Sequence, residues 1–217
     1  MEDPFAEPAD TREAILGAAF RALCEHGYAD LTIKRIGEEF DKSPSLVYHH
    51  YDGKDELLVD LLEFLLDRFE SGLSADAFDL PPRTRLDAYV SAMTDPTDVD
   101  AEHAPDGRFL RAVVELRAQA ATDEAYRDHF DRSDRVFQRF LEASVREAAA
   151  ARSDDSTDSR DGRGPVTPSE VAATLQALST GAMVRWATTN DRTWVEDVRS
   201  GIDRYLSMTL PDVDPDA

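Results

Sequence analysis

Apolar residues recur at spacings of three and four along most of this chain, which is the periodicity of helices that bury one face. No stretch alternates apolar and polar residues in the way that a half-buried strand requires. The segments in which we expect helices are residues 11–26, 32–40, 43–50, 54–72, 86–93, 109–121, 123–150, 171–186 and 194–206. The pattern therefore predicts an all-α fold of about nine helices.

Residues that favour helix ends support these boundaries near the start of the chain. The sequence at 10–13 resembles a capping box, and Gly27 is expected to end the first helix. Thr32 is a suitable N-cap for a short second helix, while Ser43 and Pro44 suit the N-cap and first turn of a third. Two short helices joined by a tight turn after a longer helix fit a helix-turn-helix.

Two further segments bear on the organisation of the chain. Residues 153–164 carry no apolar side chain, so we expect a mobile loop there. The most apolar run, residues 57–66, is interrupted by Asp60 and Glu63, and no basic and then apolar segment opens the sequence. We therefore expect neither a signal peptide nor a membrane span, and a cytoplasmic protein with no membrane partner.

The charge distribution sets one segment apart from the rest. The chain carries 45 acidic and 24 basic residues, a formal net charge of -21. All three lysines, Lys34, Lys42 and Lys54, lie between residues 32 and 54, where four acids are balanced by four bases. Lysines gathered in one segment of an otherwise acidic protein point to contact with a phosphate backbone.

Acidic residues recur throughout the chain, and arginine outnumbers lysine 21 to 3. The spread indicates a solvated acidic surface rather than a local acidic tail, and it resembles the pattern of cytosolic proteins from extreme halophiles. At molar salt the Debye length is about 3 Å, so an acidic body would hardly repel DNA. Because counterion release contributes little there, binding must depend on hydrogen bonds, fit and base contacts.

An ordered set of residues in the first sixty positions resembles a known family. The set is Ile15-Leu16-x-Ala18-Ala19, Glu25-x-Gly27-Tyr28, Leu31-Thr32-x3-Ile36, Ser43, Tyr48-x2-Tyr51 and Lys54-x2-Leu57. Its order and spacing are similar to those of the amino-terminal domain of TetR-family transcriptional regulators. Further along, residues 115–127 and the region of Gly181 resemble the BetI-like type of ligand domain.

The resemblance implies a helix-turn-helix DNA-binding domain at residues 10–55, with the motif itself at 31–51, and a helical domain for effector binding and dimerisation at 56–210. A recognition helix offers its first residues to base edges in the major groove, while lysines and helix starts hold phosphate. The residues expected to contact double-stranded operator DNA are Thr32, Lys34, Arg35, Lys42, Ser43, Pro44, Ser45, Leu46, Tyr48, His49, His50 and Lys54. The small core beneath them is assigned to Leu31, Ile33, Ile36, Phe40 and Val47.

The chain departs from the family pattern around the turn. Family members usually have alanine at position 37, Ala-Gly at 40–41 and valine at 42, where this chain has Gly37, Phe40-Asp41 and Lys42. Asp41 can adopt the left-handed conformation that glycine otherwise supplies, so we expect the turn to survive. The angle between the two helices and the base contacts are left open by these departures.

In the resembled family the second domain encloses a pocket for a small-molecule effector. Effector binding moves the fourth helix and separates the two recognition helices of a dimer from their half-sites, which requires two states of different ligand affinity. The candidate pocket residues, which are core candidates as well, are Phe64, Tyr89, Met93, Phe109, Phe130, Phe137, Met183 and Trp186. The last two helices carry apolar stripes too long for one small core, and we expect them to form the homodimer.

We expect no cofactor, no metal site and no enzymatic activity. Adjacent His49 and His50 diverge by about 100° on a helix, which is unsuited to chelation. The sequence thus predicts a ligand-responsive regulator, best described as a repressor, that binds a palindromic operator as a dimer. Two alternatives stay open: an acidic helical interaction or DNA-mimic module, and, with the least support, a small all-α enzyme.

Overall fold

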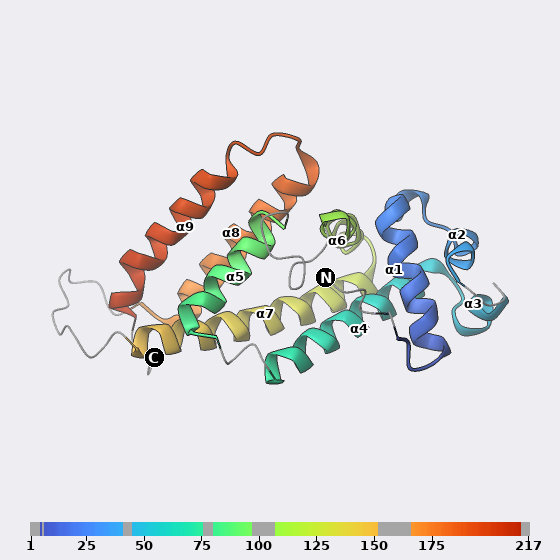
Figure 1. Ribbon diagram of the computed structural model, residues 1–217, viewed down its shortest axis with the longest axis horizontal. Helices are drawn as coiled ribbons and strands as arrows, with labels where there is room; N and C mark the ends of the chain where they lie inside the picture. The colour runs from blue at the N-terminus through green and yellow to red at the C-terminus, as the bar shows by residue number, and fades with distance from the viewer. Residues whose placement is uncertain are drawn as a thin grey trace. The chain divides into compact units, whose positions relative to one another are not determined.

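The computed structural model describes residues 5, 7–40, 45–75, 80–96, 107–151 and 166–213. Within these ranges the chain forms nine α-helices and a short 3-10 helix, which confirms the all-α fold (Figure 1). The elements are α1 (Thr11–Asp30), α2 (Ile33–Glu38), α3 (Ser45–His50), α4 (Lys54–Ala75), α5 (Pro82–Thr94), α6 (Gly107–Gln119), α7 (Glu124–Ala150), α8 (Pro168–Thr188), α9 (Val195–Thr209) and η2 (Leu210–Asp212). None of these helices is long and apolar enough to cross a membrane. The loop predicted at 153–164 lies outside the described residues.

At the starts of α1 and α2, side-chain oxygens accept hydrogen bonds from backbone N–H groups that have no partner within the first turn of the helix. The Asp10 carboxylate accepts a hydrogen bond from the Glu13 N–H at 2.9 Å, and the Thr32 hydroxyl accepts from the Arg35 N–H at 3.2 Å. Both caps agree with the starts predicted for these helices.

The first helix differs from the prediction at its far end. Gly27 leaves helical geometry, with φ 71° and ψ 169°, but helical structure resumes and continues to Asp30. A residue with a Cβ adopts such a positive φ only with strain, so glycine is required for this bend. Gly27 therefore makes a kink within α1 rather than its end.

Close contacts divide the chain into two compact units. Unit 1 consists of Met1–Glu70 with Asp100–Arg132, and unit 2 consists of Ser71–Val99 with Ser133–Ala217. Two of these boundaries fall inside the long helices α4 and α7. Unit 1 therefore includes α6 and the start of α7 as well as the predicted helix-turn-helix, and the functional boundary expected at residue 55 stays a prediction.

In unit 1, α1 lies between the α2–α3 pair and α6 (Figure 1). Short helices such as α2 and α3 are marginal alone and need tertiary packing. The core that supplies it combines buried side chains of six helices, among them Ile15, Leu16, Leu23, Ile36, Val47, Leu57, Leu61, Leu116 and Tyr126.

In unit 2, α5 packs against α8 and α9, and α8 packs against α9. The core of this unit is formed by the apolar residues Leu86, Val90, Leu141, Val145, Val171, Leu175, Ile202, Leu206 and Leu210 with their neighbours. Arg85, almost fully buried on α5, forms an ion pair with Glu147 of α7, whose carboxylate stays half exposed.

A residue ahead of α1 completes the core of unit 1. Phe5 is buried, and its ring stacks on Phe64 at 5.1 Å between centroids and contacts Phe20 at 5.8 Å. A methyl group added at Gly17 would lie 2.6 Å from the Cβ of Phe5, closer than side chains tolerate. The absence of a side chain at Gly17 is therefore what admits Phe5 to the α1 surface.

We expect Gly17→Ala to lower the free energy of unfolding by about 1–3 kcal/mol, because the added methyl group overpacks the Phe5 site. In a Phe5→Gly background, which removes the Cβ that the added methyl group would meet, the same change should cost nothing and gain up to about 1 kcal/mol from helix propensity. Denaturant unfolding of the four proteins in this cycle measures the difference. An equal loss in both backgrounds would show that Phe5 does not occupy this site.

Candidate DNA-binding interface

The α2–α3 pair is anchored to unit 1 by its apolar side chains. Leu31, Ile36, Phe40 and Val47 are buried, and Ile33 is partly buried, as assigned from the sequence. Lys42, Ser43 and Pro44, predicted to contact DNA, lie outside the described residues. Burial of one face of α3 leaves its other face turned away from the core.

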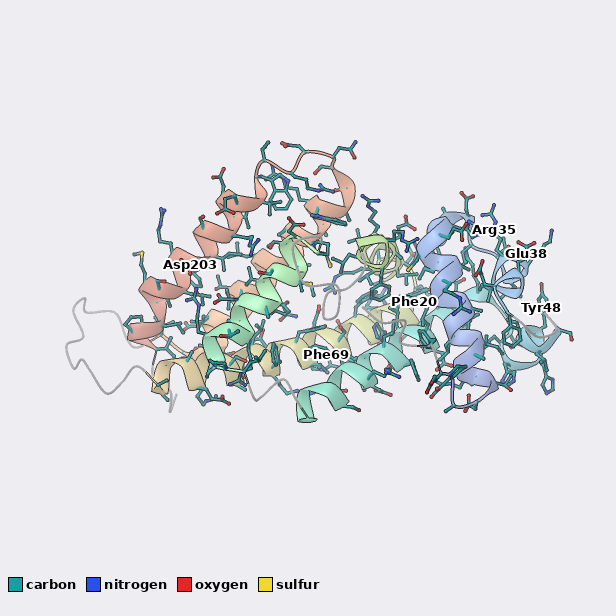
Figure 2. All side chains as sticks on the ribbon, in the orientation of Figure 1. Phe20, Arg35, Glu38, Tyr48, Phe69 and Asp203 are labelled. Carbon is teal, nitrogen blue, oxygen red and sulfur yellow. The ribbon has the colours of Figure 1, made fainter. Side chains whose placement is uncertain are left out.

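The outer face of α3 carries polar and aromatic side chains. Ser45, Tyr48 and His49, which share one helix face by their spacing of three and four, are all exposed. The Tyr48 side chain is 63% exposed, unusual for a large ring, and Figure 2 shows it at the outer edge of unit 1 with Arg35 and Glu38 of α2. Leu46 is half-buried and His50 exposed. With no acidic residue from 45 to 51, this face suits a polyanion.

The residues of α2 and its start that are predicted to contact phosphate differ in the contacts that they already make within the protein. Thr32 caps α2 through its hydroxyl, and the Arg35 guanidinium donates to the carbonyl oxygen of Asp30. Lys34 is 86% exposed, and its amine lies 3.7 Å from Glu38. An exposed ion pair of this kind contributes little to stability, so Lys34 can exchange it for phosphate at low cost.

Lys54, at the start of α4, has partners within unit 1. Its amine donates to the carbonyl oxygens of Tyr28 at 3.0 Å and Leu31 at 3.4 Å, and it lies 4.0 Å from the centre of the Tyr28 ring. A cation at the end of a helix stabilises the unpaired carbonyl groups there. Lys54 therefore ties α4 to the end of α1, in addition to the phosphate contact predicted for it.

We expect Lys54→Ala to flatten the salt dependence of DNA binding by about one ion and to weaken all sequences alike. It should also reduce stability by about 1 kcal/mol, because the cation–π contact with Tyr28 is lost. The matched control, Lys34→Ala, should flatten the salt slope without a loss of stability. An unchanged slope for Lys54→Ala would restrict this residue to its role within the fold.

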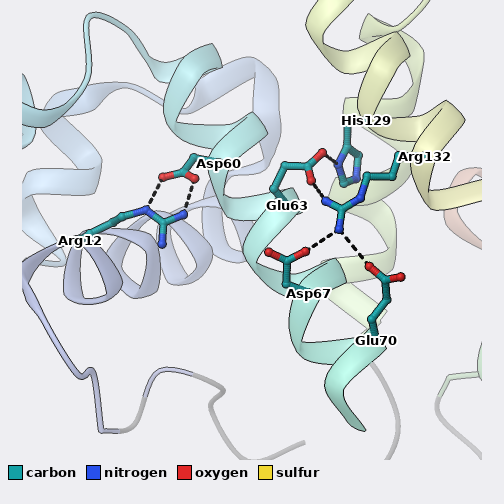
Figure 3. Close-up of polar contacts among 7 residues, drawn as sticks. All are labelled: Arg12, Asp60, Glu63, Asp67, Glu70, His129 and Arg132. Carbon is teal, nitrogen blue, oxygen red and sulfur yellow. Dashed lines mark hydrogen bonds and ion pairs between the residues drawn. The ribbon is translucent and has the colours of Figure 1, made fainter. Parts of the chain in front are cut away.

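A cluster of three residues, Arg12, Tyr51 and Asp60, supports the end of α3 from behind (Figure 3 shows the Arg12–Asp60 pair). Asp60 of α4 accepts from the Arg12 guanidinium at 2.8 Å and from the Tyr51 hydroxyl at 2.5 Å. Burial raises the pKa of Tyr51, and the bond to Asp60 raises it further. Burial also acts to raise the pKa of Asp60, but the bonds from Arg12 and Tyr51 outweigh it and the pKa is lowered.

The sequence carries no local signal for this cluster, because Arg12 and Asp60 are far apart in the chain. A second cluster on α4 has a local signal that was also missed. Glu63, Asp67 and Glu70 repeat at four and three residues, and all three pair with Arg132 of α7 (Figure 3). Buried His129 binds the same Glu63 through Nδ1 at 2.8 Å. Acids repeated on one helix face could have predicted a basic partner.

The candidate pocket residues fall into both units, and each is buried or half-buried. In unit 1, Phe64 stacks on Phe5, Phe109 lies 5.2 Å from Phe20, and the Arg117 guanidinium lies 4.9 Å from the Phe130 ring. In unit 2 the predicted residues are Tyr89 and Phe137, whose rings are 5.9 Å apart, half-buried Met93, and buried Met183 and Trp186.

Unit 2 also has an open groove of about 720 Å³ between α5 and α9. Charged and hydroxyl side chains line much of it, including Asp87, Ser91, Glu196, Arg199 and Asp203, and none of the eight predicted pocket residues takes part. Among the residues that the structure describes, no three His, Cys, Asp or Glu side chains are placed to hold a metal ion. The effector pocket stays a prediction.

Two short helices in succession, with a buried anchoring face and an exposed polar face on α3, are the arrangement expected of a helix-turn-helix, the motif of many DNA-binding regulators. Comparison with known families agrees with this geometry. Residues 15–61 match the family of bacterial regulatory proteins called tetR, and residues 82–211 match the carboxy-terminal domain of BetI-type transcriptional repressors. Because the second match spans more than half of the chain, the protein belongs to the TetR family of transcriptional regulators with a BetI-type carboxy-terminal domain. The family is one of regulators rather than enzymes.

Individual relatives extend this similarity. The HTH-type transcriptional repressor AcnR of Corynebacterium efficiens is 26% identical over 56% of each chain. The HTH-type transcriptional regulator BetI of Brucella anthropi is 33% identical over 39% of this chain and 44% of its own. The matches thus span about half the length of these curated relatives. A TetR transcription regulator from Haloarcula marismortui has a similar structure, with a TM-score of 0.71, 30% identity, and coverage of 91% and 97% of the two chains.

Proposed function

We propose that this protein is a cytoplasmic, ligand-responsive repressor that binds a palindromic double-stranded operator as a homodimer. The observation that carries the proposal is the exposed, acid-free outer face of α3, with Ser45, Tyr48 and His49 directed away from a buried anchor. Tyr48 and His50 can hydrogen-bond phosphate, and the first residues of α3 can reach base edges. A DNA mimic needs acids on the surface that stands in for DNA, and residues 45–51 have none.

The surface of α8 supports the dimer. From Val171 to Thr188 the only charged residue is Arg185, in a chain with 45 acids. Leu178 and Val184 of α8 are 44% and 40% exposed, and Met208 of α9 is 69% exposed. Gly181 of α8 and Gly201 of α9 have open space above them, so a second helix could approach closely. Exposed apolar side chains on helices with few charges and open glycine positions suit a two-fold interface.

Footprinting of the purified protein on the DNA around its own gene, at high potassium chloride, tests the operator claim. We expect protection of two half-sites related by a two-fold axis and about 34 Å apart or a multiple of that distance. Chemical protection of the protein by the same duplex should fall on Lys34, Lys42 and Lys54. The absence of DNA protection at any salt concentration would refute the proposal and favour the DNA-mimic alternative.

The charge pattern supports adaptation to concentrated salt. With 45 acids against 24 bases, repulsion within the acidic surface should destabilise the fold in dilute buffer. We expect the midpoint of thermal unfolding to rise steeply with potassium chloride up to molar concentrations, where charge screening is nearly complete. Circular dichroism across a salt series measures this, and full stability in dilute buffer would contradict it.

The effector is proposed to bind the helical domain predicted at residues 56–210 and to shift the protein between a DNA-bound and a DNA-free state. Such a ligand must bind the two states with different affinity. The eight aromatic and methionine positions predicted from the sequence remain its candidate contacts. A thermal-shift screen of small organic cations, anions and apolar compounds, followed by operator release, would identify its chemical class.

A further inference from the structure

Tyr28, the residue that follows the kink in α1, is held on several sides by other helices. Its backbone N–H donates to the Glu115 carboxylate of α6 at 2.5 Å, and its carbonyl oxygen accepts from the Lys54 amine at 3.0 Å. Its hydroxyl donates to Asp55 of α4 at 2.9 Å. In a regular helix these backbone groups would pair only within the same helix, but next to the kink at Gly27 they pair with side chains of α6 and α4, so the backbone of Tyr28 is tied to both helices.

Asp55 also holds a tyrosine from α7. The Tyr126 hydroxyl donates to the same carboxylate oxygen, Oδ1, at 3.0 Å, and the two tyrosine rings meet edge to face with centroids 6.5 Å apart. Burial, together with the Asp55 interaction, raises the pKa of Tyr126, and the same causes raise the pKa of Tyr28 to about 12. Both hydroxyls therefore remain donors at neutral pH.

The segments that carry these residues are held in place by local contacts. Asp123 accepts from the N–H of Ala125 at 2.9 Å and so caps the start of α7, two residues before Tyr126. Gly27 adopts φ 71°, and a Cβ there would lie 3.1 Å from the Glu115 carboxylate. Asp55 and Lys54 begin α4 shortly after α3 ends. A displacement of α6 or of the start of α7 must therefore act on the residues that bracket α2 and α3 in the chain.

We propose that Tyr28 and Asp55 form a coupling joint, through which α6 and α7 control the position of the helix-turn-helix. The joint comprises Tyr28, Lys54, Asp55, Glu115 and Tyr126. All of them except Lys54, whose amine is also predicted to contact phosphate, are positioning residues that do not contact DNA. Helix α7 is connected to Tyr28 through the Asp55 Oδ1 atom, which accepts from both tyrosine hydroxyls. Helix α6 is connected through the hydrogen bond from the Tyr28 N–H to Glu115. The inference rests on the proposed function, since it names how the state of the second domain reaches the operator-binding face.

The test removes single hydroxyl groups and leaves the rings in place. Tyr126→Phe removes the hydrogen bond between α7 and Asp55, and Tyr28→Phe removes the hydrogen bond between α1 and Asp55. Tyr205→Phe, on α9 in unit 2, is the matched control. In free protein at high potassium chloride, amide hydrogen exchange is measured peptide by peptide. We expect Tyr126→Phe to raise exchange in α2 and α3 by ~10-fold, since one bond to a charged acceptor is lost, although Tyr126 lies on α7.

A purely structural role predicts a different result. In that case Tyr126→Phe would raise exchange only around residues 122–132, and unchanged exchange in α2 and α3 would overturn the joint. Tyr205→Phe should leave α2 and α3 unaffected. Asp55→Ala, which removes the acceptor that both hydroxyls share, should reproduce the Tyr126→Phe result.

A second measurement uses the operator duplex defined by footprinting. By linkage, if α7 affects operator affinity, operator binding must affect α7. We expect the duplex to slow exchange at residues 122–132 in the parent protein and to lose this effect in Tyr126→Phe. An equal effect in both proteins would refute the joint. If the parent protein bound no duplex, the proposed function would be refuted but the joint would not. The joint is tested separately by hydrogen exchange in the free protein.

Discussion

Gly181→Arg is expected to convert the dimer to monomers and to weaken operator binding by about 100-fold or more, because two linked half-site contacts would become independent. No atom lies within 4 Å of the position that a Cβ would occupy at Gly181, so the monomer should fold normally. Across a two-fold axis the new arginine would face a patch whose charge is already positive at Arg185. Analytical ultracentrifugation and operator titration measure the two effects.

The matched control for this substitution is Ala88→Arg, which adds the same charge at an exposed position of α5 in the same unit. It should leave both the assembly state and operator affinity unchanged. Dilution provides an independent check: a protein that runs as a monomer with no loss of DNA binding would eliminate the dimer claim. Equal affinities of Gly181→Arg and Ala88→Arg would place the interface elsewhere.

Asp60→Ala is expected to lower the free energy of unfolding by about 2 kcal/mol, because Arg12 and Tyr51 would lose the charged acceptor that they share. The estimate allows for solvent screening, since the Arg12 side chain is 43% exposed. Tyr51 follows α3 directly, so its loosening should also weaken operator binding. Denaturant unfolding and operator titration measure both effects, and Tyr51→Phe should show a smaller loss of stability.

The effect of Asp60→Ala should depend on pH in a defined direction. Because the pKa of Asp60 is lowered in the folded protein, its contribution is present above the pKa of the unfolded chain, about 3.9, and is lost as pH falls through the folded value. The difference in stability between parent and variant should therefore be constant near neutral pH and shrink below about pH 4. A difference that persisted unchanged at lower pH would mean that the carboxylate charge is not what stabilises the cluster.

The structure adds packing contacts to the roles predicted for several residues. Lys54 was assigned to phosphate from its place in the family pattern, and its amine lies on two carbonyl oxygens and the ring of Tyr28. Phe64 and Phe109 were assigned to an effector pocket from their apolar character, and they pack on Phe5 and Phe20. An apolar or charged side chain has several suitable partners in a folded chain, and residue type alone does not choose among them.

The sequence by itself determined the helical class, most helix boundaries and the family, because each depends on local signals. Periodic apolar residues select helices, Asp10 and Thr32 cap the turns that follow them, and the spacing from Ile15 to Leu57 identifies the helix-turn-helix. Only the tertiary structure decided which polar residues meet. Asp55 and Asp60 are two of 45 acids, and no local pattern pairs them with Tyr126 or Arg12. Such pairs are selected by packing between segments far apart in the chain, and they include the joint through which we propose the two functions of the protein are coupled.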